Sequence, residues 1–408
     1  MSLRSEVKNP PRRTEEIEPN NDEARGLAVY QQTELDVLAN GITPERIFDN
    51  GRLILACGSG NIELSRAIAR HFQQEYGTVL LQETMEPINE HIFADGERAP
   101  RYTTPLRNKV VYLIQAPTPT IRTQSGEVDP YSGINDQIVE LMLMINAAKK
   151  ASAQEVNVVL PYAPYLRQDR KTRSGEPMSA SWFLQAIEDA GADSIFVLDP
   201  HSKQISGSVR IPFDIVHASY VFKQYIENLI GDTTNLICLS PDTGGVKMTD
   251  NYAQVLTNCG IQTMIGLGVI AKLRNPSTGL TQSSPPIGIT PGCDVLIIDD
   301  IAASCGTLIS AAKLAKEAGA KRVFAAVVHG LFTGDALTKL HQYPDLELVL
   351  TTNSIRHRPQ IIQESQQEDG KIRIIDLAPF LADVIYCLYT GKPLDQFFLD
   401  KNGITHEV

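Results

Sequence analysis

From Arg52 onward, short apolar runs alternate with longer amphipathic segments, and this alternation restricts the possible fold more than any other feature of the sequence. The apolar runs predict buried strands at 53–56, 110–114, 156–160, 195–198, 236–239, 264–267, 295–298, 323–328, 346–350 and 372–375. Segments with helical spacing of apolar residues lie at 62–72, 136–150, 180–190, 244–256, 308–315 and 379–388. Strands that alternate with helices form parallel sheets with right-handed crossovers. We therefore expect an α/β protein.

The pattern restarts after about residue 217, which predicts two tandem domains, each a mainly parallel sheet flanked by helices. We expect an N-terminal domain at 51–217 and a C-terminal domain at 218–408. Residues 1–50 form an N-terminal extension that we expect to be partly disordered, because 1–23 are polar and rich in Pro, Asn and Glu. Residues 27–48 are mixed in character and could pack on the body of the protein.

Composition excludes several classes of function. The 408 residues are 42% hydrophobic and 21% charged, as in a globular protein, and the net charge of −11 argues against non-specific nucleic-acid binding. No apolar run approaches the roughly 20 residues of a membrane span. The six cysteines form no C-x-x-C pair, which favours free thiols in a reducing cytoplasm over a zinc or redox site.

The segment 294–319 carries the clearest functional signal. Its buried strand ends in two carboxylates, Asp299 and Asp300, and a loop of small residues then leads into a helix. Such a loop can direct backbone N–H groups and a helix dipole at a phosphate, while carboxylates at a strand end can accept hydrogen bonds from hydroxyls. The segment fits a sugar phosphate, although ordinary helix capping produces a similar pattern. The lysine of a P-loop is missing, because Gly306-Thr307 is followed by Leu308.

Two further clusters have both a functional and an ordinary interpretation. Four cations lie between Arg167 and Arg173, together with Gln168 and Asp169, and they could hold a polyphosphate or form a solvated loop. Phe93, Asp95 and Glu97 surround a turn glycine. They could stack on a base and hydrogen-bond to it, although most such segments are simple loops.

Two more features occur near strand ends and in a long loop. His201 and Asp242 each follow a predicted strand and could share a hard cation such as Mg²⁺. Lys272 and Arg274 precede a stretch rich in Ser, Thr, Pro and Gly at 275–291, which resembles a mobile lid. Cations at the root of a lid could close onto a charged transition state, but an ordinary surface loop is equally consistent.

In this order, the motifs resemble those of the ribose-phosphate pyrophosphokinases, the PRPP synthetases. The resemblance runs from about Leu53 to Phe398. It includes FADGE from Phe93, NDQIVELMLMINAAKKASA from Asn135, PYAPYLRQDRK from Pro161, AGADSIFVLDPHSKQISG from Ala190, SPDTGGV from Ser240, IDDIAASCGT from Ile298, AKRVFAAVVHGLFTGDA from Ala320 and DLAPFLADVI from Asp376.

The resemblance implies a fold of two type I phosphoribosyltransferase-like domains. It also implies transfer of the β,γ-diphosphoryl group of ATP to the C1 hydroxyl of ribose 5-phosphate, with Mg²⁺ as the metal and AMP as the second product. The nucleotide site would be lined by Arg167, Gln168 and Asp169. Its adenine would be held by residues that a neighbouring subunit contributes, namely Phe93, Asp95 and Glu97. His201 and Asp242 would position Mg²⁺–ATP. The remaining implied roles are ribose binding by Asp299 and Asp300, 5-phosphate binding by Ser304, Cys305, Gly306 and Thr307, and catalysis by Lys272, Arg274 and His201.

The sequence departs from the family pattern at several positions. Ala303 and Ser304 replace the usual Asp-Thr of the loop, Ala271 and Leu273 change the usual lid root, and Gln115-Ala116-Pro117 replaces the usual Gln-Ser. These departures leave two alternatives open: diphosphorylation of a larger ribose 5-phosphoester such as ADP-ribose, and a non-catalytic subunit associated with a true synthetase. The resemblance further implies self-association, as a dimer or hexamer.

Overall fold

The computed structural model describes residues 51–76, 91–122, 128–129, 132–230, 233, 235–258, 264–274 and 281–394. All of these residues belong to one compact unit, residues 44–408. The expectations for the N-terminal extension at 1–50, and for the 275–280 part of the lid, lie outside the described residues.

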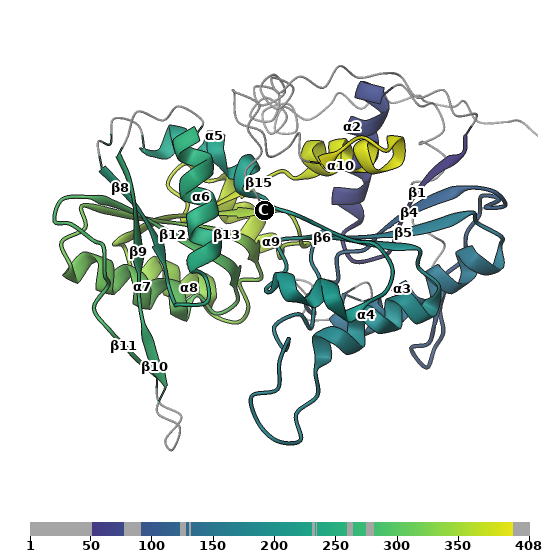
Figure 1. The fold of residues 1–408 in the computed structure, drawn as a ribbon, viewed down its shortest axis with the longest axis horizontal. Helices are drawn as coiled ribbons and strands as arrows, with labels where there is room; N and C mark the ends of the chain where they lie inside the picture. Colours follow the sequence, from purple (N-terminus) through teal and green to yellow (C-terminus); the bar gives the residue numbers. More distant parts are fainter. Residues whose placement is uncertain are drawn as a thin grey trace, which may run out of the picture. The chain divides into compact units, whose positions relative to one another are not determined.

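The first sheet has five parallel strands and contains the N-terminal part of the chain. Its order is β1 (Leu53–Cys57), β4 (Val110–Ile114), β5 (Glu155–Leu160), β6 (Ser194–Leu198) and β7 (Phe213–Val216). Its strands read as nearly unbroken runs of Val, Ile and Leu because helices cover both faces. In Figure 1, α3 (Ile134–Lys150) and α4 (Ser179–Ala190) lie on one face, and α2 (Ile62–Tyr76) lies on the other.

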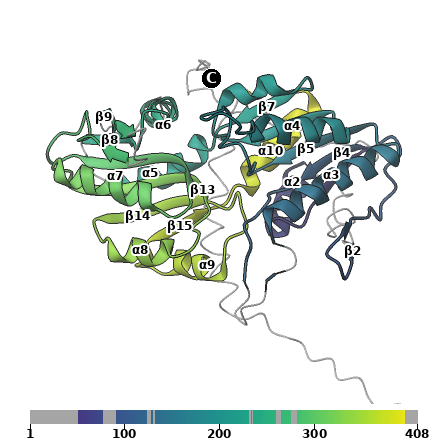
Figure 2. The same cartoon turned by 90° about the horizontal axis from the view of Figure 1, so that it is seen from below.

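The second sheet has six parallel strands, and helices also cover both of its faces. Its order is β15 (Ile372–Ile375), β14 (Leu346–Thr352), β13 (Arg322–Gly330), β12 (Asp294–Ala302), β8 (Asn235–Ser240) and β9 (Met264–Val269). The helices α5 (Ser219–Ile230) and α6 (Val246–Asn258) lie on one face, and α7 (Gly306–Glu317) and α8 (Ala336–Gln342) lie on the other (Figure 1). Figure 2 shows α9 (Pro359–Gln366) next to α8, beside β14 and β15.

The order of the second sheet reverses direction at β8. The chain moves from β8 to β9 on one side and then to β12 on the other. A crevice opens at the carboxyl ends of two strands whose connections leave in opposite directions, and ligands of open α/β sheets bind in such crevices. The carboxyl ends of β8 and β12 are therefore where a site is expected.

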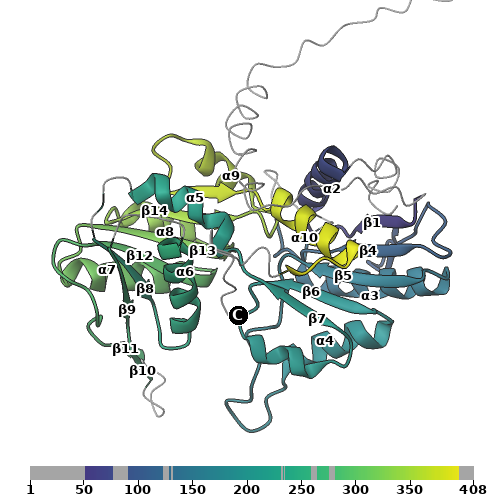
Figure 3. The same cartoon turned by 45° about the horizontal axis from the view of Figure 1, so that its top comes forward.

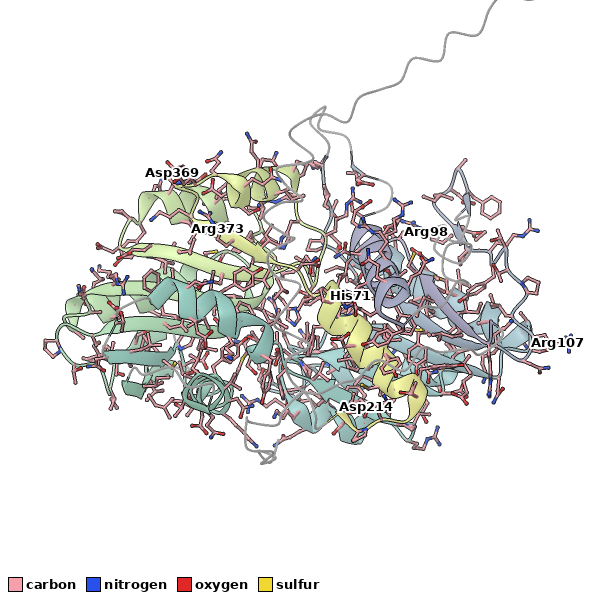
Figure 4. All side chains as sticks on the ribbon, turned by 90° about the horizontal axis from the view of Figure 1, so that it is seen from above. His71, Arg98, Arg107, Asp214, Asp369 and Arg373 are labelled. Atoms are coloured by element: carbon pink, nitrogen blue, oxygen red, sulfur yellow. The ribbon has the colours of Figure 1, made fainter. Side chains whose placement is uncertain are left out.

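The last helix of the chain, α10 (Ala378–Thr390), packs on α2 of the first sheet rather than on the sheet that precedes it (Figure 3). The rings of Tyr76 and Tyr386 are stacked with centroids 3.8 Å apart. The Tyr76 hydroxyl donates a 2.6 Å hydrogen bond to the buried carboxylate of Asp383, and His71 Nε2 lies 3.5 Å from the same oxygen. Figure 4 shows His71 where α2 meets α10. The predicted division at 217/218 stays a prediction.

Two short antiparallel hairpins complete the described elements. One pairs β2 (His91–Ile92) with β3 (Arg98–Ala99), and the other pairs β10 (Lys272–Arg274) with β11 (Thr281–Ser283). A 3₁₀ helix, η3 (Lys203–Ser208), follows β6. Among the residues that the structure describes, no helix is both long and apolar enough to cross a lipid bilayer. The five described cysteines are buried free thiols, namely Cys57, Cys238, Cys293, Cys305 and Cys387.

The fold confirms two mainly parallel sheets flanked by helices, and it corrects two predicted boundaries. The strand that carries the acidic pair does not end at Ile298 but continues to Ala302, because Ile301 and Ala302 pair with His329 and Gly330 of β13. The helix predicted from Gly244 begins at Val246, because Gly244 and Gly245 use their N–H groups to bind the side chain of Asp242.

Candidate active site

The acidic pair lies at the switch point of the second sheet. Asp299 and Asp300 are half-buried residues near the end of β12, and Asp242 follows the adjacent strand β8. Burial, together with the negative charges of Asp300 and Asp242, raises the pKa of Asp299 well above its usual value. Burial also acts to raise the pKa of Asp300, but the hydrogen bond and positive charge of His201 outweigh it, and the pKa falls.

A contact between the two sheets forms at this acidic pair. His201, just after β6 of the first sheet, places its Nδ1 2.6 Å from Oδ2 of Asp300. The Asp300 hydrogen bond raises the pKa of His201, in spite of partial burial. A carboxylate accepts a hydrogen bond from Nδ1–H, so the neutral ring carries its lone pair on Nε2. His201 also lines the cavity described below.

The loop after the acidic pair presents several unused backbone donors. Cys305 has a left-handed backbone (φ 60°) and precedes the first residue of α7, Gly306. In the described part of the chain, the backbone N–H groups of residues 304–308 donate no hydrogen bond. The Gly306 Cα faces open space, since an added Cβ would meet only the Ser304 hydroxyl at 3.7 Å. Free N–H groups at a helix N-terminus can bind an anion such as phosphate.

The loop that follows β8 is held by its own carboxylate. Asp242 Oδ1 accepts hydrogen bonds from the N–H groups of Gly244 (2.9 Å) and Gly245 (3.0 Å). Ser240 Oγ donates to the carbonyl of Asp242 at 2.6 Å. The structure therefore fixes Asp242 beside the acidic pair, where its charge acts on Asp299.

A cavity of about 620 Å³ lies beside the acidic pair, and both sheets line it. Arg167 and Gln168 contribute from the loop after β5, and His201 contributes from the loop after β6. The charge of Asp169 acts on His201, so this carboxylate is also close to the cavity. Of the predicted nucleotide residues, the structure thus brings together Arg167, Gln168 and Asp169.

Local strain and a short hydrogen bond fix the wall formed by the loop after β5. Tyr165 has a positive φ of 65°, which is unusual for a bulky residue. Its hydroxyl donates a 2.7 Å hydrogen bond to Asn135 of α3. Gln168 Oε1 accepts a hydrogen bond from Ser179 of α4 at 2.5 Å. These contacts leave Arg167 exposed at the cavity edge.

The remaining predicted residues lie elsewhere. Phe93, Asp95 and Glu97 are exposed on the β2–β3 hairpin and do not line this cavity. Phe93 N–H donates to the Glu97 carbonyl at 2.9 Å, which shapes the hairpin tip. Lys272 and Arg274 are in β10, so the root of the predicted lid is an antiparallel hairpin. The 281–291 part of that segment is ordered by this pairing and by the bridge between Val269 and Ile287.

Sequence reasoning missed three residues that shape the site. Tyr162 and His329 line the cavity with their ring centroids 5.1 Å apart, and Asp199 is buried beside them. His329 lies at the carboxyl end of β13, next to the strand of the acidic pair. A polar residue that ends an otherwise apolar strand was the signal that could have identified it, as it had identified His201.

The charged residues alone do not form a complete metal centre. Among the described residues, no cluster of three or more His, Cys, Asp or Glu side chains has the geometry to hold a metal ion. His201 contacts Asp300 rather than Asp242, and Asp242 binds its own loop. Hard oxygen donors with few direct protein ligands are nevertheless usual for Mg²⁺, which keeps several waters and binds through substrate phosphates.

The structure has two parallel sheets, which meet at the acidic pair and at the loop before α7. This arrangement defines a protein built from two phosphoribosyltransferase-like domains. Residues 53–191 match a family described as the N-terminal domain of ribose phosphate pyrophosphokinase, and residues 269–399 match the phosphoribosyl synthetase-associated domain. The chain belongs to the ribose-phosphate pyrophosphokinase family. A relative named ribose-phosphate pyrophosphokinase from Chlorobaculum tepidum is 31% identical over 85% of this chain and 95% of its own length.

Two further comparisons agree with this family. A ribose-phosphate pyrophosphokinase from Prochlorococcus marinus is also 31% identical, over 86% of this chain and 94% of its own length. The crystal structure of phosphoribosylpyrophosphate synthetase from Mycobacterium smegmatis has a TM-score of 0.66 and 26% identity, and the match covers 83% of this chain and 99% of that chain.

Proposed function

We propose that the protein transfers the β,γ-diphosphoryl group of ATP to the C1 hydroxyl of ribose 5-phosphate. The hydroxyl oxygen attacks the β-phosphorus, the bond between that phosphorus and the oxygen bridging to the α-phosphate breaks, and AMP leaves. The hydroxyl proton is released, and the products are PRPP and AMP. One observation carries this proposal: His201 and Asp300 are in contact at 2.6 Å. This contact brings the cavity lined by Arg167 and Gln168 next to the acidic pair and the loop that follows it.

The second sheet supplies the acceptor half of the site. Asp299 and Asp300 accept hydrogen bonds from the ribose hydroxyls, as carboxylates at a switch point do for ribose. The free N–H groups of residues 304–308 bind the 5-phosphate, helped by the dipole of α7. Ser304 and Thr307 are exposed at this helix start and add hydroxyl donors, and Cys305 supplies the left-handed turn.

The first sheet supplies the donor half. Arg167 forms charge-assisted hydrogen bonds to the phosphates of ATP, and Gln168 and Asp169 orient the nucleotide in the cavity. Such a reaction needs little covalent chemistry from the protein, because in-line positioning and stabilisation of the phosphoryl charge carry most of the catalysis. Lys272 and Arg274, in β10 at the root of the lid hairpin, supply cations for that charge.

Magnesium fits the residues present. His201, which lines the cavity from the first sheet, and Asp242, beside the acidic pair of the second sheet, would hold Mg²⁺ together with phosphate oxygens and water. When bound, the ion neutralises the polyphosphate charge. The chain itself contributes the orientation of His201, which the Asp300 carboxylate fixes.

The relatives favour ribose 5-phosphate over the two alternatives. Both curated relatives carry the name ribose-phosphate pyrophosphokinase, which argues for the smaller acceptor and against a non-catalytic subunit. The substitutions at Ala303 and Ser304 do not remove the backbone donors, because those donors belong to the main chain.

We infer that the protein self-associates and acts in the cytoplasm. The exposed hairpin with Phe93, Asp95 and Glu97 carries an aromatic ring and two carboxylates into solvent, away from the cavity of its own chain. A neighbouring copy would place these residues against adenine. This arrangement gives each site residues from two chains.

One assay tests the proposed reaction. The purified full-length chain is incubated with Mg²⁺–ATP and either ribose 5-phosphate or ADP-ribose, and AMP release is followed. We expect turnover with ribose 5-phosphate. AMP release only with ADP-ribose would support the larger acceptor, and no AMP with either acceptor would contradict an enzymatic role.

A matched pair of lysine variants sharpens this assay. We expect Lys272→Ala to lower kcat by about a hundredfold or more, while the Kd for ATP measured by calorimetry changes little, because its charge acts mainly on the transition state. Lys313→Ala removes an exposed cation of α7 that pairs at 4.0 Å with Glu317, and it should keep wild-type kcat. An unchanged kcat for Lys272→Ala would refute the assigned role.

A further inference from the structure

We propose that His329 is a positioning residue that holds the Asp199 carbonyl and thereby fixes His201 against Asp300. His329 would not touch substrate through this contact. It would act through the segment 199–201. The expected effect of His329 on catalysis rests on the proposed function. The contact between His329 and the Asp199 carbonyl can be tested without it.

The hydrogen bonds of His329 define which ring nitrogen carries its proton. Nε2 lies 3.3 Å from the carbonyl oxygen of Asp199, and Nδ1 lies 2.9 Å from the hydroxyl of Ser354. A carbonyl can only accept, so Nε2–H donates to it, and Nδ1 then accepts from the Ser354 hydroxyl. The side chain therefore links β13 to the end of β6, which belongs to the other sheet.

Burial keeps this arrangement in one state. His329 is only 2% exposed, and burial lowers its pKa, so the ring stays neutral with a single N–H. Tyr162 packs against the ring at a centroid distance of 5.1 Å. The backbone next to it is also tightly packed, since a Cβ on Gly330 would come within 2.4 Å of the Phe332 ring.

The peptide that His329 holds is strained and needs support. Asp199 has a positive φ of 37°, in a region that non-glycine residues rarely adopt. Its carboxylate is fixed by His217 Nδ1 at 2.5 Å and by the N–H of Ala218 at 2.7 Å. These bonds hold the side chain, and the His329 bond holds the carbonyl. Strained residues persist where surrounding contacts determine their conformation from several directions.

The register of the second sheet places the contacts of His329 and of Asp300 side by side. His329 pairs with Ile301, the residue directly after Asp300, so the two side chains that grip segment 199–201 come from adjacent positions on neighbouring strands. His329 donates to the carbonyl of Asp199, and Asp300 accepts from the imidazole of His201. Pro200 between them has a fixed φ, which limits how the segment can move. Loss of the His329 bond should therefore loosen the position of His201.

Two variants of His329 separate positioning from simple packing. His329→Gln places an amide NH₂ where Nε2 was and can still donate to the Asp199 carbonyl. His329→Asn places its amide near the former Nδ1, where it can meet Ser354 but falls short of that carbonyl. His357→Gln is the matched control, because His357 is also buried and donates from Nε2 to a carbonyl, that of Thr352 at 2.8 Å, without a bond to β6.

We expect His329→Asn to lower kcat by about ten- to a hundredfold, with a smaller change in the Kd for ATP, because misplacement by about 1 Å costs up to about a hundredfold. His329→Gln should keep kcat within about threefold of wild type, and so should His357→Gln. A lowered melting temperature with unchanged kcat in His329→Asn would overturn the proposal, as would equal loss in both His329 variants.

A second readout does not depend on turnover. Long-range ¹H–¹⁵N spectra of histidine-labelled protein, with the His201 signals assigned by His201→Gln, report which ring nitrogen of His201 is protonated. We expect Nδ1–H in the wild type and in His329→Gln, and tautomer averaging in His329→Asn. If the wild type makes no AMP but the His201 signals still depend on residue 329, the proposed function fails and the positioning role stands. Identical His201 spectra in all three proteins would overturn the positioning role.

Discussion

A buried histidine stabilises the fold only while it is neutral, and His357 is the clearest case. It is 7% exposed and donates from Nε2 to the Thr352 carbonyl at 2.8 Å. Burial lowers its pKa to about 4, while in the unfolded chain it titrates near 6.5. Above pH 6.5 the residue is neutral in both states. Below pH 6.5, His357 takes up a proton in the unfolded chain, whereas in the folded chain it does so only near pH 4.

His357 should therefore make the protein less stable as the pH falls from 6.5 to 4. We expect the free energy of unfolding, measured with denaturant, to fall between pH 7 and pH 4.5 by about 2–3 kcal/mol less in His357→Gln than in the wild type. Glutamine does not titrate, and its amide can still donate to the Thr352 carbonyl. Parallel pH profiles for the two proteins would show that His357 titrates alike in both states.

Sequence reasoning at the residue scale identified single polar residues but not their partners. Asp299, Asp300 and His201 were each marked because a polar side chain ended an apolar run. The contact between His201 and Asp300 joins residues 99 positions apart, and no local pattern records it. The sequence suggested instead that His201 and Asp242 could share a cation, because each follows an apolar run, and it gave no sign that Asp242 binds the N–H groups of its own loop.

At the scale of elements, prediction succeeded where apolar patterns were long. The strand at 110–114 matched β4 at both ends, and the helices at 136–150 and 180–190 began within two residues of α3 and α4. β7, α8 and α9 were missed because each is short, and β7 carries the half-buried polar residue Asp214. The twelve-residue helix α5 was missed as well. The lid root was expected to be a loop but pairs as β10 and β11, since antiparallel pairing needs little sequence signal.

One buried carboxylate lies in the contact between α2 and α10, beside the stacked rings of Tyr76 and Tyr386. Asp383 is 2% exposed, and the Tyr76 hydroxyl donates to it at 2.6 Å. Tyr76→Phe keeps the ring stacked on Tyr386 but removes that donor. We expect it to lower the free energy of unfolding by about 1–3 kcal/mol, the cost of leaving a buried acceptor short of a partner.

A double-mutant cycle checks this expectation by thermal or denaturant unfolding. The double variant Tyr76→Phe/Asp383→Ala should lose clearly less free energy of unfolding than the sum of the losses in the two single variants, because both changes remove the same bond. Additive costs would mean that the hydroxyl and the carboxylate contribute separately.

At the scale of the whole molecule, the site is expected to need more than one copy of the chain. The cavity brings together Arg167, Gln168 and His201, while Phe93 remains exposed on a separate hairpin. Sequence reasoning could assign that hairpin to a neighbouring subunit only by family resemblance, because an assembly interface leaves no periodic signal within one chain.

Complementation between variants tests this arrangement. Phe93→Ala and Lys272→Ala should each be nearly inactive alone. If the hairpin serves a neighbour's site, co-expressed variants form mixed assemblies in which one site has both residues intact, and random pairing in a dimer restores about a quarter of wild-type AMP release. Activity no greater than the sum of the separate variants would place Phe93 in its own chain's site or outside any site.

The return of α10 to α2 also affects how the chain is made. A ribosome builds from the N-terminus, and a domain ordinarily folds as soon as its own residues have emerged. Here the helix that covers α2 comes after the whole second sheet. At typical elongation rates, α10 follows the end of the first sheet by roughly ten to thirty seconds. During that interval the nascent first sheet exposes the apolar side of α2, so this surface is where a chaperone would act.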